Sequence, residues 1–148
     1  MNKIKLLFIV ILGFLGTGAL AQTSLSEAVA PGNKVYFQLV NDTENPIPED
    51  EIEDVTRELV EAGSWVSVAT PEEADFILKV EARKKMVFNS PRTWLTPSVL
   101  DKSGNELWKA KTQQADATMF NGFKATNTCI GKVIDKSFKG DLFKKAKR

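Results

Sequence analysis

The sequence predicts an α+β fold, a two-layer sandwich in which a mixed or antiparallel sheet of about five strands carries two helices on one face. Residues 74–83 supply the first observation, because apolar side chains occupy every second position, as in a strand with one buried face. Residues 48–62 and 123–138 supply the second, because their apolar residues recur at helical spacing. The predicted element order is β-α-β-β-β-β-α.

The first residues have the pattern of a secretory signal peptide and are predicted to lie outside the fold. A short basic start precedes an apolar run from Ile4 to Leu20, and Ala19-Leu20-Ala21 fits a cleavage site between Ala21 and Gln22. Cys129 is the single cysteine, so no lipid-anchoring cysteine follows that site. We therefore expect a periplasmic or secreted protein without a membrane anchor after cleavage.

Four segments follow from this reasoning. Residues 1–21 form the signal peptide, 22–33 a flexible leader, 34–143 a single α/β domain, and 144–148 a basic tail. One cysteine cannot form an internal disulfide, so an ordinary apolar core must stabilise the domain. The thiol is expected to be buried and inert, with a reactive or intermolecular role as the alternative.

The first half of the domain is predicted to be strand, helix, strand. Residues 34–40 alternate and form the first strand, and residues 41–48 form a proline-containing loop. Pro48 opens a helix at its first position, and Gly63 ends it. Residues 65–69 then form the second strand.

The second half is predicted to be three strands and a helix. The strand that begins near residue 74 continues to about residue 88, where Asn89-Ser90-Pro91 ends it. Residues 93–100 and 106–111 form a hairpin around a turn with Gly104 in the left-handed position. Pro97 cannot donate a backbone hydrogen bond, which favours an edge or bulged strand. The last helix carries an apolar stripe, predicted to consist of Phe123, Asn127, Ile130, Val133, Ile134 and Phe138.

Two motifs within residues 34–143 resemble those of small bacterial envelope domains. These are Glu73-Ala74-Asp75 before a strand, and Asp101, Gly104 and Trp108 in a hairpin. The chain is similar in this to the TolB N-terminal domain and to CsgG-type and Lpo-type periplasmic domains. The resemblance implies a domain that binds other envelope proteins and has no catalytic activity of its own.

Charge is distributed unevenly along the chain. Residues 22–75 carry 13 acidic and 2 basic side chains, whereas residues 76–148 carry 6 acidic and 16 basic ones. Two interpretations remain open: the two parts face one another and neutralise their charges, or the basic part forms a patch for an acidic partner.

The sequence offers little support for catalysis. It contains no histidine, which removes the commonest general base and the imidazole ligands of zinc sites. Glycine-rich nucleotide-binding motifs are also missing, and no cofactor or metal is expected. Paired carboxylates could still serve a small hydrolase.

One cluster of positive and aromatic residues is a candidate binding patch. It begins near Arg83, at the end of the long strand, and its members are Lys84, Lys85, Phe88, Arg92 and Trp94. Such surfaces bind polyanions. Alternatively, Arg83 and Lys85 are simply solvated while Phe88 and Trp94 cover the core.

We therefore expect an exported, non-enzymatic binding or adaptor module of the bacterial cell envelope. Its partner is expected to be an envelope protein or an anionic envelope polymer, and not nucleic acid. A carboxylate-dependent hydrolase or a ligand-binding periplasmic protein is the alternative.

Overall fold

The structure, a computed structural model, describes residues 23–147, and the predicted cleavage site at Ala21 and Gln22 lies outside them. A mixed sheet has the strand order β2-β1-β3-β4-β5, with β6 paired to β4. The strands are β1 (Lys34–Asn41), β2 (Val66–Ser67), β3 (Phe76–Val87), β4 (Ser90–Leu100), β5 (Glu106–Lys109) and β6 (Gln113–Asp116). The main helices are α3 (Glu49–Ala62) and α4 (Ala125–Lys132), the latter continuing as a π-helical segment (Val133–Leu142) and α5 (Phe143–Ala146).

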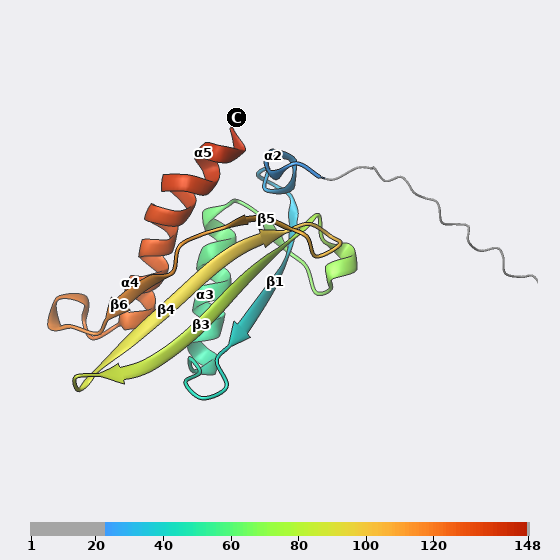
Figure 1. Cartoon of the computed structure of the whole chain (residues 1–148). Helices are drawn as coiled ribbons and strands as arrows, with labels where there is room; N and C mark the ends of the chain where they lie inside the picture. Colours follow the sequence, from blue (N-terminus) through green and yellow to red (C-terminus); the bar gives the residue numbers. More distant parts are fainter. Residues whose placement is uncertain (1–22, 148) are drawn as a thin grey trace, which may run out of the picture.

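The main helices cover one face of the sheet, which confirms the predicted two-layer α+β sandwich (Figure 1). β1 is parallel to β2 and to β3, so the chain crosses over through α3 between the first two strands. β3, β4 and β5 then follow as antiparallel neighbours. The sheet is thus of the mixed kind, and β6 is a strand that the sequence analysis did not predict.

β3 has the two faces that its alternation predicts. Phe76, Leu78 and Val80 are fully buried beneath the helices, whereas Lys79 is half-buried and Glu81 is exposed on the opposite face. Because β3 is central and long, its register with β1 and β4 determines which side chains share each face of the sheet.

Pro97 was expected to mark an edge or bulged strand; β4 is not an edge strand, but its pairing with β5 has a bulge-like register shift between Val99 and Leu100. β4 is an interior strand, with β3 on one side and both β5 and β6 on the other. The Pro97 carbonyl accepts a hydrogen bond from the Ala110 backbone N–H at 3.0 Å. In a strand, the backbone N and C=O groups of one residue point toward the same neighbouring strand. The Pro97 nitrogen, which has no hydrogen to donate, therefore faces the break between β5 and β6.

The Trp65 ring packs against the C-terminal end of α3. Gly63 follows the last helical residue, as predicted, and a Cβ there would lie 2.3 Å from the Trp65 ring. The ring is buried in the core, and its Nε1 donates a hydrogen bond to the Val29 carbonyl at 2.9 Å. The glycine therefore permits a close approach of the indole to the helix end.

The last helix differs from its prediction at its start and in its period. Phe123 is not part of the buried stripe: it lies in a loop and is 71% exposed. Asn127 is exposed too, and the helix begins at Ala125. The π-helical hydrogen bonds space residues five apart on one face, so Val133 and Phe138 are both fully buried while Ile134 is half-buried.

Both ends of the described chain pack on the domain. Residues 22–33, expected as a flexible leader, contain the helix α2 (Leu25–Ala28), and Ala28 and Val29 belong to the buried core. α5 extends into the expected basic tail, and its Ala146 packs against the core. α2 and α5 contact each other, which brings the two ends of residues 23–147 together.

Candidate functional site

The residues of the predicted patch are divided between the two faces of the sheet. The register of β3 and β4 pairs Arg83 with Trp94 and Lys85 with Arg92 on the face that the helices leave uncovered. Lys84 has the opposite orientation, because successive strand residues point to opposite faces. We call the uncovered face the open sheet face.

Lys84 lies beneath the sheet and contacts the acidic helix. Its Nζ is 2.7 Å from Glu51 Oε2, and each side chain is 22% exposed. The Thr126 hydroxyl donates to the other Glu51 oxygen and is also 2.8 Å from the Thr93 hydroxyl. Within residues 23–147 this is the one ion pair that joins the acidic and basic parts of the chain. Lys84 is therefore a structural residue, separated from the rest of the patch.

Trp94 is the centre of the open sheet face. The Arg83 guanidinium lies 4.0 Å from the centroid of its ring, in cation–π contact, and Arg92 lies 5.8 Å away. The Trp94 Nε1 donates to Gln114 Oε1 at 2.9 Å, which fixes the indole on the sheet. Arg92 forms a two-pronged ion pair with Asp116 on β6.

Two cations of the open sheet face form no ion pair with an acid among the described residues. Arg92 neutralises Asp116, and its hydrogen bond holds the pKa of the Asp116 carboxyl below the ordinary value. Glu81 lies 4.0 Å from both Lys79 and Lys109. Arg83 and Lys85 have no acidic partner within the described residues. These two cations, together with Trp94, form the part of the patch that is available for binding.

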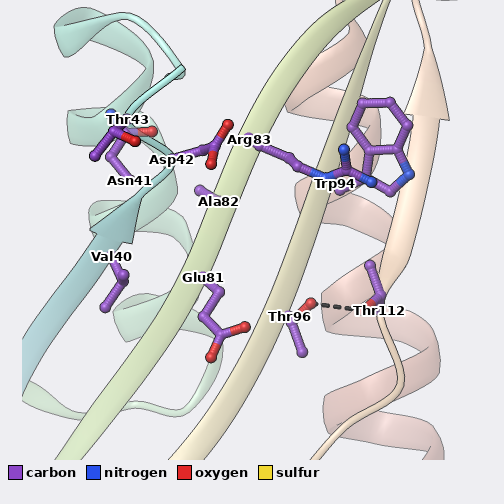
Figure 2. A pocket seen from close by; sticks show the side chains of 10 residues that line it. All are labelled: Val40, Asn41, Asp42, Thr43, Glu81, Ala82, Arg83, Trp94, Thr96 and Thr112. Carbon is purple, nitrogen blue, oxygen red and sulfur yellow. Dashed lines mark hydrogen bonds between the residues drawn. The ribbon is translucent and has the colours of Figure 1, made fainter. Parts of the chain in front are cut away.

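A shallow hollow of about 450 Å³ lies beside this pair (Figure 2). The loop after β1 forms one wall, and β3, β4 and the approach to β6 form the others. The Thr96 and Thr112 hydroxyls at its far side are 2.7 Å apart. It is lined by polar and charged groups, among them Asp42, Thr43, Glu81, Arg83, Thr96 and Thr112.

The hollow was not predicted, although the sequence contains part of its signal. Thr96 lies two residues after Trp94 on the same strand, so alternation alone places both side chains on one face. The wall made by Asp42 and Thr43 had no such signal. It depends on a long-range contact, in which the Lys84 backbone N–H donates to the Asn45 carbonyl at 2.9 Å.

Phe88 lies apart from the open sheet face, at the turn between β3 and β4. It is 96% exposed and therefore does not cover the core.

Cys129 is buried as expected. Its Sγ donates to the Gln113 carbonyl at 3.3 Å, and burial raises the pKa of the thiol to about 12. No group of acids and cysteine suited to a metal ion occurs among residues 23–147. Over the same residues no helix has the length and apolarity to cross a membrane.

No protein-family model matches the chain, and neither does any curated protein. Solved structures do share the fold. A dodecamer of a single-residue variant of PelC from Paraburkholderia phytofirmans is 17% identical with a TM-score of 0.54, and the match covers 78% of this chain and 90% of that one. A PelC dodecamer from the same organism in another crystal form is 21% identical with a TM-score of 0.52, covering 75% and 88%.

A minor lipoprotein from Acinetobacter baumannii is also similar, at 14% identity and a TM-score of 0.48, with 72% of this chain and 91% of that one covered. The likeness to PelC shows a shared fold. The resemblance to TolB-type and CsgG-type domains stays a prediction.

Proposed function

We propose that this chain is a non-enzymatic binding module of the bacterial cell envelope, and that its open sheet face binds an anionic envelope component. The observation that carries the proposal is the Arg83 guanidinium stacked on Trp94, with Lys85 two residues further along the same strand face. Neither cation is neutralised by an acid among the described residues. A guanidinium held on an indole is pre-ordered and keeps its N–H donors for a carboxylate, phosphate or sulfate group.

The sequence supports an exported protein, through the signal-peptide pattern of residues 1–21. Periplasmic or secreted proteins meet acidic polymers and acidic protein surfaces rather than nucleic acid. The partner we propose is therefore an anionic envelope polymer or the acidic surface of an envelope protein.

The hydrolase alternative is disfavoured by the environment of Glu81. A general acid of the glycosidase type is kept protonated by an apolar pocket. Glu81 is instead 48% exposed and lies between the ammonium groups of Lys79 and Lys109. The hollow is thus better suited to ionic binding than to acid catalysis.

The test compares two double charge reversals that change the net charge equally. Arg83→Glu with Lys85→Glu alters the open sheet face, whereas Lys144→Glu with Lys147→Glu alters exposed lysines of the C-terminal turn. We expect capture of envelope components, and of dextran sulfate as a model polyanion, to fall only for the first variant. The loss should be largest at low salt, where screening is weakest. Equal capture by both variants and the wild type would refute the proposal.

A further inference from the structure

The exposed large apolar side chains of the protein are concentrated on two loops. Among residues 23–147, seven such side chains are exposed: four belong to these loops, Met86 lies at the end of β3 beside the first loop, and Val40 and Val66 lie elsewhere. Phe88 and Phe120 are 96% and 95% exposed, so neither has a packing partner in the fold. We call the five residues the aromatic tip: Met86, Phe88, Met119, Phe120 and Phe123.

The two loops are neighbours although about thirty residues separate them in the sequence. The Ser90 hydroxyl donates to the Ala117 carbonyl at 2.7 Å, and the Ala117 N–H donates to the Pro91 carbonyl at 2.9 Å. Figure 1 shows both loops at the same end of the sheet, at the lower left, beyond the start of β4. The aromatic tip therefore lies at one end of the sheet.

The backbone of both loops holds these side chains outward. Phe88 and Asn89 have φ of 50° and 68°, as the two central residues of a type I′ turn require. That turn favours asparagine and glycine, and a phenylalanine in the left-handed region is an outlier that points to function. Phe123 has φ of 62°. Asn121 fixes its loop, since its side chain accepts from the Thr118 N–H and donates to the Asp116 carbonyl.

Positive charge surrounds the aromatic tip. The segments 84–92 and 116–124 contain four basic residues, of which Lys84 is paired with Glu51 and Arg92 with Asp116. Lys85 and Lys124 are exposed beside the aromatic residues, and neither forms an ion pair within the described chain. The tip thus combines apolar side chains that extend into solvent with lysines placed just behind them.

We propose that the aromatic tip inserts into the surface of an anionic lipid bilayer. Two protruding loops can enter the apolar boundary of a bilayer without a matching groove, which a protein partner would have to supply. Aromatic rings and lysines at the level of the headgroups are typical of such contacts. Apolar burial and attraction to anionic lipids together determine the strength of binding. This contact is reversible, and it shares Lys85 with the open sheet face, whereas the apolar side chains of the tip belong to it alone.

The test measures co-sedimentation of the exported chain with vesicles of phosphatidylcholine, alone or mixed with phosphatidylglycerol. The tip variant is Phe88→Ser with Phe120→Ser, which leaves the charge of the open sheet face unchanged. Its matched control is Val40→Ser with Val66→Ser, the two exposed apolar residues outside the tip. We expect binding to the anionic vesicles, a loss of about tenfold or more for the tip variant, and no loss for the control.

Fluorescence quenching locates the contact. With brominated lipids in the anionic vesicles, Phe120→Trp should add a quenched emission component, whereas Val66→Trp should add an unquenched one. The variants replace exposed residues, so thermal unfolding should be unchanged in all of them.

Failure of the wild type to sediment with anionic vesicles would refute the proposal, as would equal binding by the tip variant. If the tip variant instead dissociates an oligomer in sedimentation velocity and vesicle binding is unaffected, the tip is a contact between proteins and the lipid proposal is wrong. The dextran sulfate arm of the charge-reversal test contains no lipid, so its outcome is independent of these results.

Discussion

Lys84 Nζ lies 2.7 Å from Glu51 Oε2, across the interface between the sheet and α3, while the adjacent Lys85 projects from the opposite face. Two consecutive lysines therefore have different roles. The first links the helix to the sheet, and the second belongs to the surface proposed for binding.

The two lysines should differ in their contribution to stability. Lys84→Ala removes a partly buried, charge-assisted hydrogen bond and should lower the free energy of unfolding by about 1–2 kcal/mol. Lys85→Ala should change it by less than about 0.5 kcal/mol, because the residue is exposed. Urea unfolding of both variants measures the difference. Equal values would contradict the assigned faces of β3.

Gly63 should not tolerate a methyl group. A Cβ would lie 2.3 Å from the buried Trp65 ring, so Gly63→Ala should lower the free energy of unfolding by about 1–3 kcal/mol through overpacking. The control is Gly131→Ala in α4, where no atom lies within 4 Å of the added carbon. It should stabilise the protein by about 0.5–1 kcal/mol, because alanine suits a helix better. Thermal or urea unfolding distinguishes the two, and a stable Gly63→Ala protein would disprove the contact.

Asp101 should make hairpin stability depend on pH. Burial would raise the pKa of its carboxyl, but hydrogen bonds from Asn105, Ser103 and Gly104 outweigh burial and hold the pKa below its ordinary value. A lowered pKa stabilises the fold above the unfolded-state value, and the contribution disappears as pH falls through the folded-state value.

The free energy of unfolding of the wild type should therefore exceed that of Asp101→Asn by about 1 kcal/mol at neutral pH. This advantage should shrink below about pH 4. Urea unfolding across this range measures it, and a difference independent of pH would show that the charge of Asp101 has no role.

Cys129 should be unreactive in the folded protein. Burial raises the pKa of its thiol to about 12, so almost no thiolate exists at pH 8, and the side chain is inaccessible. We expect no reaction with Ellman's reagent under native conditions and one thiol per chain in denaturant. Rapid labelling of the native protein would restore the reactive role that the sequence left open.

Local patterns predicted the parts of the fold that depend on few residues. The alternation around Leu78 and Lys79 identified the faces of β3, and Gly63 identified the end of α3. β6 had no such signal, since Gln113–Asp116 contains one apolar residue and becomes a strand through its pairing with β4. The helical period of 3.6 residues also could not reveal the π-helical spacing of Val133 and Phe138.

The site was partly predictable for the same reason. The alternation that separates Leu78 from Lys79 extends to Lys84 and Lys85, so their opposite orientation was implicit in the sequence. The pairing of Arg83 with Trp94 depends on the exact length of the turn at Phe88 and Asn89. The wall of the hollow at Asp42 depends on how the loop after β1 folds against β3, which no local pattern specifies.

The break opposite Pro97 affects how the sheet can meet other molecules. On that side of β4 the sheet is closed by two strands of four residues each, β5 and β6, rather than by one long strand. A strand from another chain would find no continuous row of backbone donors and acceptors there. Interrupted edges of this kind resist the edge-to-edge growth that leads to fibrillar aggregates. The break between β5 and β6 thus also protects the protein from self-association along that border.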